Sequence, residues 1–266
     1  MNSINAIAAI ALNTFRETVR ERIIYAFILF ACAISLLAIM LGSLSVGQDV
    51  RILDDMGMAA IALIGGVIAV FAGTNLVYKE LERRTVYIIF TKPVTGWQFI
   101  AGKYIGLSLC LLMIVAAMGL FLGFLVWLSA TPTLTSLSQD LLLICKPLVL
   151  VYIELLFVIA AATFFSTFAS PMMSVVFTLG LWLIAHFVDS LKTLGHMSQN
   201  PALTKFSDIV YLLLPDLGSL TKVRGILMYG QHAPTELVSY ITCYVFGYVM
   251  LLLLLASVVT EQREFP

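Results

Sequence analysis

The sequence predicts an all-α polytopic membrane protein with six transmembrane helices. Hydrophobic residues make up 61% of its 266 residues and charged residues 11%, against about 45–50% and about 25% in soluble proteins. A soluble chain of this composition would have too few polar side chains to cover its surface. Six apolar runs also reach the length of about 20 residues that a helix needs to cross a bilayer. The 15 basic and 15 acidic residues balance, so no nucleic-acid partner is indicated.

Residues 1–22 form an amphipathic pattern ahead of the first apolar run. One helical face carries the apolar residues Ile4, Ile7, Ala8, Ala11, Phe15 and Val19. The opposite face carries Asn5, Asn13, Arg16 and Arg20. This pattern predicts a helix that lies in the membrane interface. A partly ordered leader is the alternative. A cleaved signal peptide is not expected, because the following apolar run exceeds the usual 7–15 residues.

The six predicted spans belong to one transmembrane domain, residues 1–266. They occupy residues 23–44, 56–77, 100–129, 147–168, 171–191 and 237–259. Thr95 and Gln98 fit a capping box, so the third helix is expected to start ahead of its apolar run. Ser170 and Pro171 supply an N-cap and a first-turn proline for the fifth helix.

The distribution of basic residues indicates the orientation. An even number of spans places both termini on one side of the membrane. With the termini inside, nine of the 15 Lys and Arg residues are cytoplasmic and six are outside. The positive-inside rule therefore predicts cytoplasmic termini in a multi-pass protein of the plasma membrane.

The inner segment at residues 78–94 joins the second and third predicted spans. Its first half is charged, and its second half, Val86 to Phe90, is apolar but too short to span. Pro93 ends it. A short helix with a charged end and an apolar side is suited to docking into a partner's groove. The alternative is a solvated turn with an interfacial apolar patch.

The outer segment at residues 192–236 is broken by turn-forming residues. Its apolar run, residues 209–214, stops at Pro215 and is too short to cross. Further breaks are expected at Gly218, Gly225, Gly230 and Pro234. The pattern predicts short re-entrant helices that dip partway into the membrane, which is tolerated where the backbone is buried in protein. A small folded outer cap is the alternative.

Glu154 is the one acidic residue well inside a predicted span. A charge at the centre of a membrane helix costs about 2.5–3.5 kcal/mol on the insertion scale, so Glu154 should be neutral or face the protein interior. It is a candidate for the transport or proton path. The alternatives are an interhelical hydrogen bond that holds the fold and a residue that snorkels to the interface.

Four polar residues near the outer side are the only candidate metal ligands. His186 and Asp189 stand three apart and share a helical face, and His196 and His232 are on the same side. Such residues bind borderline metals, but no spacing here fixes a coordination geometry. We therefore predict no metal site, and interpret these residues as outer-interface polar groups.

The chain lacks the common catalytic motifs. There is no G-x-x-x-x-G-K-[ST], no HExxH and no GxSxG, which excludes the nucleotide, zinc-protease and hydrolase sites that these motifs build. No polar segment is long enough to house a nucleotide site. We therefore expect that this chain is not an enzyme and carries no cofactor.

The order of its parts resembles the ABC-transporter type-2 permease family over nearly the whole chain. The most specific similarity covers Glu80–Thr85, Phe90–Thr95 and Gly102–Tyr104. Further similar pieces are Glu154–Leu156, Phe165–Pro171, Leu213–Asp216 and the tail Glu261–Phe265. In that tail Gln262 departs from the family pattern, which has a basic residue there.

The resemblance implies the partners of this chain. They would be a second permease, in a homodimer or a pseudodimer, and two separate cytoplasmic ATPase subunits, which would bind ATP and Mg. The inner segment would be a coupling helix that enters a cleft on each ATPase. The residues expected there are Glu80, Glu82, Arg83, Arg84, Thr85, Val86, Ile89, Phe90, Lys92 and Pro93.

The outer segment would be a re-entrant pair that gates the exit, and the location would be a bacterial inner membrane. Some similar permeases assist extracytoplasmic metalloenzyme maturation, so an extracytoplasmic partner is a further candidate.

Two functions are compatible with this sequence. One is the membrane half of an ATP-driven exporter, with a lipid-like or amphipathic substrate. The other is an autonomous secondary carrier or channel that uses Glu154 as its proton or substrate site. Carriers usually have several intramembrane charges and repeated halves. Here one central acid and no internal repeat are found, so the exporter is favoured.

Overall fold

The computed structural model describes residues 3–42, 49–82, 95–129, 134–198, 200–228 and 234–262. Within these ranges all regular structure is helical, which confirms the predicted all-α class. The helices are α1 (Ser3–Val19), α2 (Arg22–Gly42), α3 (Asp49–Glu82), α5 (Gly96–Ser129), α6 (Leu134–Ser166), α7 (Pro171–Met197), α8 (Pro201–Leu213), α9 (Gly218–Met228) and α10 (Thr235–Gln262).

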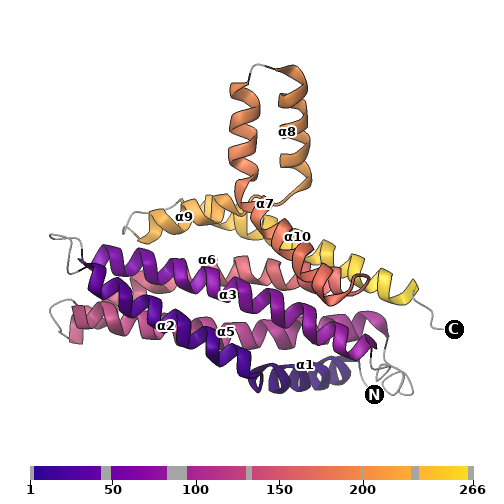
Figure 1. Cartoon of the computed structure of the whole chain (residues 1–266), viewed down its shortest axis with the longest axis horizontal. Helices are drawn as coiled ribbons and strands as arrows, with labels where there is room; N and C mark the ends of the chain where they lie inside the picture. Colours follow the sequence, from indigo (N-terminus) through magenta and orange to yellow (C-terminus); the bar gives the residue numbers. More distant parts are fainter. Residues whose placement is uncertain are drawn as a thin grey trace.

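Long helices running side by side form the body of the molecule (Figure 1). Helices α3, α5 and α6 pack against one another, α2 covers α3, and α10 lies on α5 and α6. Their shared core consists of buried aliphatic side chains such as Ile61, Leu111 and Val158. Both chain termini lie at the same end of this bundle (Figure 1).

Five helices among the described residues are long and apolar enough to cross a membrane. They are Arg51–Thr74, Gly96–Leu128, Ile144–Ser166, Pro171–Met197 and Thr235–Glu261. The chain is therefore a multi-pass membrane protein. The first predicted span, residues 23–44, overlaps the 21-residue helix α2 up to Gly42, and α2 is not among these five.

The helix that holds the second predicted span is longer than that span, which was predicted to end at residue 77. Helix α3 continues through the charged residues to Glu82, so Glu80 and Glu82 extend a long helix and do not start a separate one. Lys and Glu are good helix formers, so a helix can continue through charged residues. Hydropathy shows only where the apolar part of the helix ends. The remainder of the predicted coupling segment, residues 83–94, lies outside the described residues.

The helix that holds the fourth predicted span is also longer than that span. Helix α6 begins at Leu134 and passes through Pro147. Proline removes one backbone donor from a helix, but membrane helices tolerate it when neighbouring groups satisfy the freed carbonyl. The proline therefore does not mark a boundary here.

Two predicted helix starts are confirmed. The Thr95 N–H donates to Gln98 Oε1 at 3.3 Å, which is one half of the capping box, and α5 begins at Gly96. Ser170 is extended and precedes Pro171, the first residue of α7. Its side chain makes no capping hydrogen bond, so the proline and the extended backbone define this start.

The segment that was predicted to lie outside, residues 192–236, contains short helices as expected, but their boundaries differ. Helix α7 runs on to Met197, and Gly225 lies inside α9 without breaking it. The C-terminal part of α7 and the following α8 stand side by side as a hairpin that projects from the bundle (Figure 1).

The N-terminal helix α1 packs closely along α5. A Cβ atom added at Gly106 would lie 2.5 Å from the Ala11 carbonyl oxygen, and one at Gly102 would lie 2.8 Å from Ile10 Cβ. The two glycines, four residues apart, therefore let the helix backbones approach. The face of α1 in this contact is only partly the predicted apolar one, because Ile4 is 78% exposed.

Candidate functional site

A buried polar cluster surrounds Glu154 at the meeting point of three helices. Glu154 lies on α6 and is 2% exposed. On α7, the Trp182 indole N–H donates to Glu154 Oε1 at 3.0 Å, and His186 Nε2 lies 3.3 Å from the same oxygen. On α9, Arg224 Nη1 is 3.8 Å from Glu154 Oε2. The carboxylate thus faces the protein interior and contacts both α7 and α9.

Local helix geometry explains why these groups converge. Trp182 and His186 are four residues apart on α7, so they share one face. The Trp182 ring lies against Gly66 of α3, where an added Cβ would be only 2.4 Å from the ring. The glycine leaves room for the indole, and the indole can then reach Glu154.

The ring of His186 is held at both nitrogens. Its Nδ1 lies 3.0 Å from the carbonyl oxygen of Trp182, which can only accept a hydrogen bond. Nδ1 therefore carries a proton, and Nε2 is the nitrogen that faces Glu154. The ring orientation is fixed by one backbone and one side-chain contact.

The start of α9 is attached to α7 beside this cluster. The Leu217 N–H donates to the Ala185 carbonyl at 3.0 Å, and a Cβ at Gly218 would lie 2.9 Å from the His186 carbonyl oxygen. The Asp216 carboxylate accepts from the Ser219 N–H at 3.1 Å, and so caps the helix, where negative charge is favourable.

An ion pair forms a second link between α9 and α7. Lys222 donates to the Asp189 carboxylate. The hydrogen bond and the negative charge of Asp189 raise the pKa of Lys222 above its usual range. Both side chains are partly or largely exposed, so this pair contributes less to stability than the buried contacts of Glu154.

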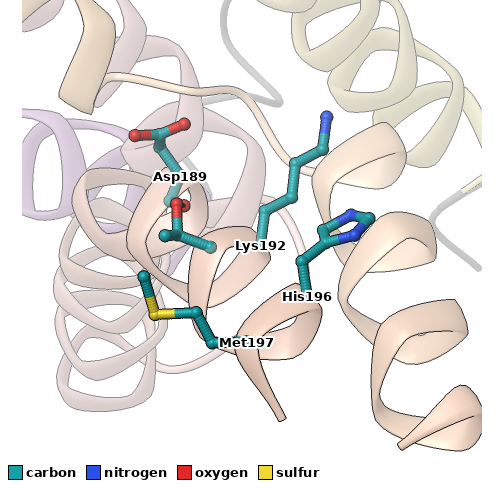
Figure 2. Close-up of a pocket in the computed structure, with 5 residues that line it drawn as sticks. Asp189, Lys192, His196 and Met197 are labelled. Carbon is teal, nitrogen blue, oxygen red and sulfur yellow. Dashed lines mark hydrogen bonds between the residues drawn. The ribbon is translucent and has the colours of Figure 1, made fainter. Parts of the chain in front are cut away.

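An open pocket lies further along α7, on the projecting hairpin (Figure 2). It is lined by Asp189, Lys192, Thr193, His196 and Met197. Lys192 Nζ lies 3.8 Å from the centre of the Tyr211 ring on α8, and His196 Nε2 lies 3.1 Å from Asp208 Oδ1. These contacts hold the hairpin together through its polar side.

The candidate metal ligands are not brought together. His186 contacts Glu154, Asp189 pairs with Lys222, and His196 pairs with Asp208. His232 lies outside the described residues. Across the part of the chain that the structure describes, no three His, Cys, Asp or Glu side chains gather as a metal site would require.

Sequence reasoning missed two members of the cluster, Trp182 and Arg224. The four-residue spacing between Trp182 and His186 was a usable signal, because it places both on one helical face. Arg224 gave no such signal, since its contact with Glu154 joins residues far apart in the sequence.

The predicted coupling residues are only partly placed. Glu80 and Glu82 belong to the last turns of α3. Those outside the described residues are Arg83, Arg84, Thr85, Val86, Ile89, Phe90, Lys92 and Pro93. Immediately after them, α5 begins beside the end of α10, where a Cβ at Gly96 would be 3.1 Å from Glu261 Cγ.

A multi-pass helical membrane protein with a charged cluster between its helices is typical of a transport component. Comparison with protein families supports this class: residues 8–260 match the model of the ABC-2 family transporter proteins. The chain belongs to this family and is a membrane permease component of an ABC transporter, as the resemblance in the sequence indicated. Membrane subunits of the family typically lack an ATPase domain. A comparison with curated proteins gives no match.

Proposed function

We propose that this chain is the membrane half of an ATP-driven exporter whose ATPase subunits are separate polypeptides. The family match over residues 8–260 carries this proposal, together with membrane helices distributed over the same residues. No Walker A motif occurs in the sequence. ATP and Mg would therefore be bound by the partner subunits.

In this proposal α2 is a sixth span and both termini are cytoplasmic. The 21 residues of α2 meet the length of about 20 that a spanning helix needs. The excess of basic residues on the inner segments supports the orientation, and both termini lie at one end of the bundle (Figure 1). A bacterial inner membrane is the proposed location.

The end of α3 and residues 83–94 would couple ATP hydrolysis to the membrane helices. This segment joins α3 to α5, and these two helices pack against each other. The first turn of α5 also contacts the end of α10 through Gly96. A force applied between α3 and α5 would therefore reach three helices directly.

Helices α8 and α9 would form the outer gate in an assembly of two permease copies. The contacts of α9 with Ala185, Asp189 and Glu154 tie this gate to α6 and α7. Glu154 would hold the three helices together, and an amphipathic or lipid-like molecule would be moved along the seam between the copies.

Copurification with the ATPase encoded by a neighbouring gene tests this function. We expect a stable complex with two copies of each subunit, in which replacing the Walker A lysine of the ATPase abolishes hydrolysis but not assembly. A permease that forms no such complex, and that moves solutes in response to a proton gradient alone, would instead be an autonomous carrier.

A further inference from the structure

The hairpin of α7 and α8 meets the bundle near the middle of the membrane spans. At the foot of its α7 leg, the Trp182 indole donates to Glu154, which lies near the middle of the α6 span. At the foot of its α8 leg, the Leu212 carbonyl oxygen accepts a hydrogen bond from the Tyr248 hydroxyl at 3.2 Å, and Tyr248 is the central residue of the α10 span. From this level the hairpin stands across the long direction of the bundle (Figure 1). It therefore projects sideways at the depth of the membrane.

One side of the hairpin is too polar to be covered by lipid. The open pocket on this side is lined by Asp189, Lys192, Thr193 and His196, together with Met197, and the chain reverses direction between α7 and α8. Backbone outside a helix is found at membrane depth only where it is buried in protein or lines a water-filled cavity. Ionisable side chains follow the same rule. The hairpin therefore needs a neighbour other than lipid.

The side of α8 that points away from α7 carries an apolar stripe. The stripe consists of Ala202, Phe206, Ile209 and Leu213. These residues recur every three or four positions, so they share one helical face. The three larger side chains are 63%, 64% and 73% exposed. Ser207, on the other side of the helix, packs against Gly195 of α7. The stripe thus stays uncovered within the part of the chain that the structure describes.

The two helices that hold this hairpin are also the least covered of the candidate spans. Only 22% of the most apolar part of the α7 span and 28% of that of α10 is buried, against 56–67% in the three other candidate spans among the described residues. On α10, Met250, Leu251 and Leu254 are 58%, 53% and 61% exposed. Uncovered apolar surface is therefore concentrated on the helices from which the hairpin projects.

We propose that the α8 stripe packs against the uncovered side of α7 and α10 in a second copy of this chain. In a twofold-symmetric pair each copy supplies both surfaces, so the contact is made twice. The apolar side chains of the partner would cover the stripe, and water on the outer side of the seam would reach the polar pocket and the chain reversal. The inference rests on the proposed assembly of two copies, and it specifies the surface that forms it.

The exposed area is of the size that such an interface needs. A large apolar side chain buries on the order of 100 Å². The three large residues of the α8 stripe and the three of α10 would then bury about 600 Å² in each copy. A stable interface of standard size buries about 800 Å² per partner. The contact would therefore form the larger part of the interface.

A photoreactive residue identifies what lies against the stripe. Phe206 is replaced by p-benzoylphenylalanine, and the membranes of cells that produce the permease and its ATPase are irradiated. We expect a covalent product with twice the mass of the permease. Phe124, which is 50% exposed on α5, is replaced in the same way as a matched control, and it should give lipid adducts only.

An alanine substitution measures the contribution of the stripe to association. The labelled permease is diluted into liposomes, and the dimer fraction is counted by single-molecule photobleaching. Phe206→Ala should weaken association about tenfold or more, because it removes a large apolar anchor from the contact. Phe124→Ala should leave association unchanged. Both variants should keep the helix content of the wild type, since both side chains are exposed in the single chain.

Several results would overturn the proposal. Lipid adducts alone from position 206, or a product with a different protein, would show that no second copy covers the stripe. Wild-type association in Phe206→Ala has the same meaning, and if that variant does not fold, the cross-linking result decides. A dimer product from position 124 alone would place the interface on α5.

The number of permease copies in the purified complex with the ATPase separates this inference from the proposed function. Two copies, without a dimer product from position 206, would remove only the α8 surface. A single copy in each complex would remove the assembly of two permeases itself.

Discussion

At the scale of single residues, Glu154 owes its burial to the donors that surround it. An ionised or shared-proton carboxyl inside a membrane protein is stable only when its oxygens accept hydrogen bonds. Trp182 donates a hydrogen bond to Oε1, His186 Nε2 lies 3.3 Å from the same oxygen, and Arg224 pairs with Oε2 at 3.8 Å. The stability of the fold should therefore depend on having an oxygen acceptor at position 154 more than on a full negative charge there.

Two substitutions of Glu154 separate these contributions. Glu154→Leu leaves the Trp182 N–H without an acceptor and Arg224 without its ion-pair partner. We expect it to destabilise the protein by about 3–5 kcal/mol, as for a buried pair that loses one partner. Glu154→Gln keeps an oxygen for Trp182 and should retain assembly and most coupled ATPase activity. Unfolding temperature in detergent and hydrolysis by the complex are the measurements. A well-assembled Gln variant without coupled activity would show that ionisation matters and would favour the carrier.

Gly106 offers a second residue-scale prediction. A Cβ at this position would lie 2.5 Å from the Ala11 carbonyl oxygen and 2.7 Å from Thr14 Cβ. Gly106→Ala should therefore push α1 off α5 and destabilise the protein by about 1–3 kcal/mol, which is typical of overpacking.

Gly180 provides the matched control for Gly106. It also lies in a membrane helix, but nothing is within 4 Å of an added Cβ. Gly180→Ala should be neutral or raise stability by up to about 1 kcal/mol through helix propensity. Equal unfolding temperatures for the two alanine variants would show that the α1–α5 contact contributes little.

At the scale of helices, the sequence predicted the apolar spans well, but it predicted the ends of the helices that contain them less well. Apolar length predicts spans because the bilayer sets that length. The start of α5 followed from the capping box of Thr95 and Gln98, which is a local interaction. The ends of α3 and α6 did not follow, because the helix continues through Lys79 and Pro147 beyond the apolar sequence. Backbone hydrogen bonding and hydropathy are separate properties.

The candidate site shows the same division between local and tertiary signals. Glu154 was identified because an acid inside an apolar run is unusual, and His186 because it shares a face with Asp189. Their contact with each other could not be predicted, since it depends on how α6 and α7 pack. The contact with Arg224 depends in addition on the path of the chain from α7 through α8 to α9.

The orientation of the helices is open to a direct test. Single cysteines are introduced as Glu82→Cys, at the end of α3, and Ser198→Cys, after α7. The background lacks Cys32, Cys110, Cys145 and Cys243. An impermeant maleimide added to intact cells should label Ser198→Cys only, and Glu82→Cys should react after the membrane is opened. Labelling of Glu82→Cys from outside would reverse the proposed topology.

At the scale of the whole molecule, the end of the bundle that holds both termini is densely connected. Gly102 and Gly106 let α1 pack against α5. Gly96, in the first turn of α5, lies against Glu261 at the end of α10. Phe99 and Ile100 pack with Ala256 of α10 in a small separate cluster. In the sequence, residues 83–94 connect Glu82 of α3 to Thr95. A partner that binds them would act on α1, α3, α5 and α10 together.

Ile89→Asp tests whether this segment transmits the motion of the ATPase. Val86, Ile89 and Phe90 are the apolar residues that we expect to enter a groove of the partner, and Glu82, Arg83 and Arg84 are charged. Buried apolar anchors usually dominate an interface, so a charge at Ile89 should cost about 2 kcal/mol or more, roughly 30-fold in affinity. Arg83→Ala should be milder, because rim charges mainly tune the rate of association.

Each purified variant is mixed with the ATPase, and its retention and the permease-dependent ATP hydrolysis are measured. Both variants should keep the unfolding temperature of the wild type if the segment acts only through its partner. Wild-type retention and hydrolysis with Ile89→Asp would show that the segment is only a turn between two spans.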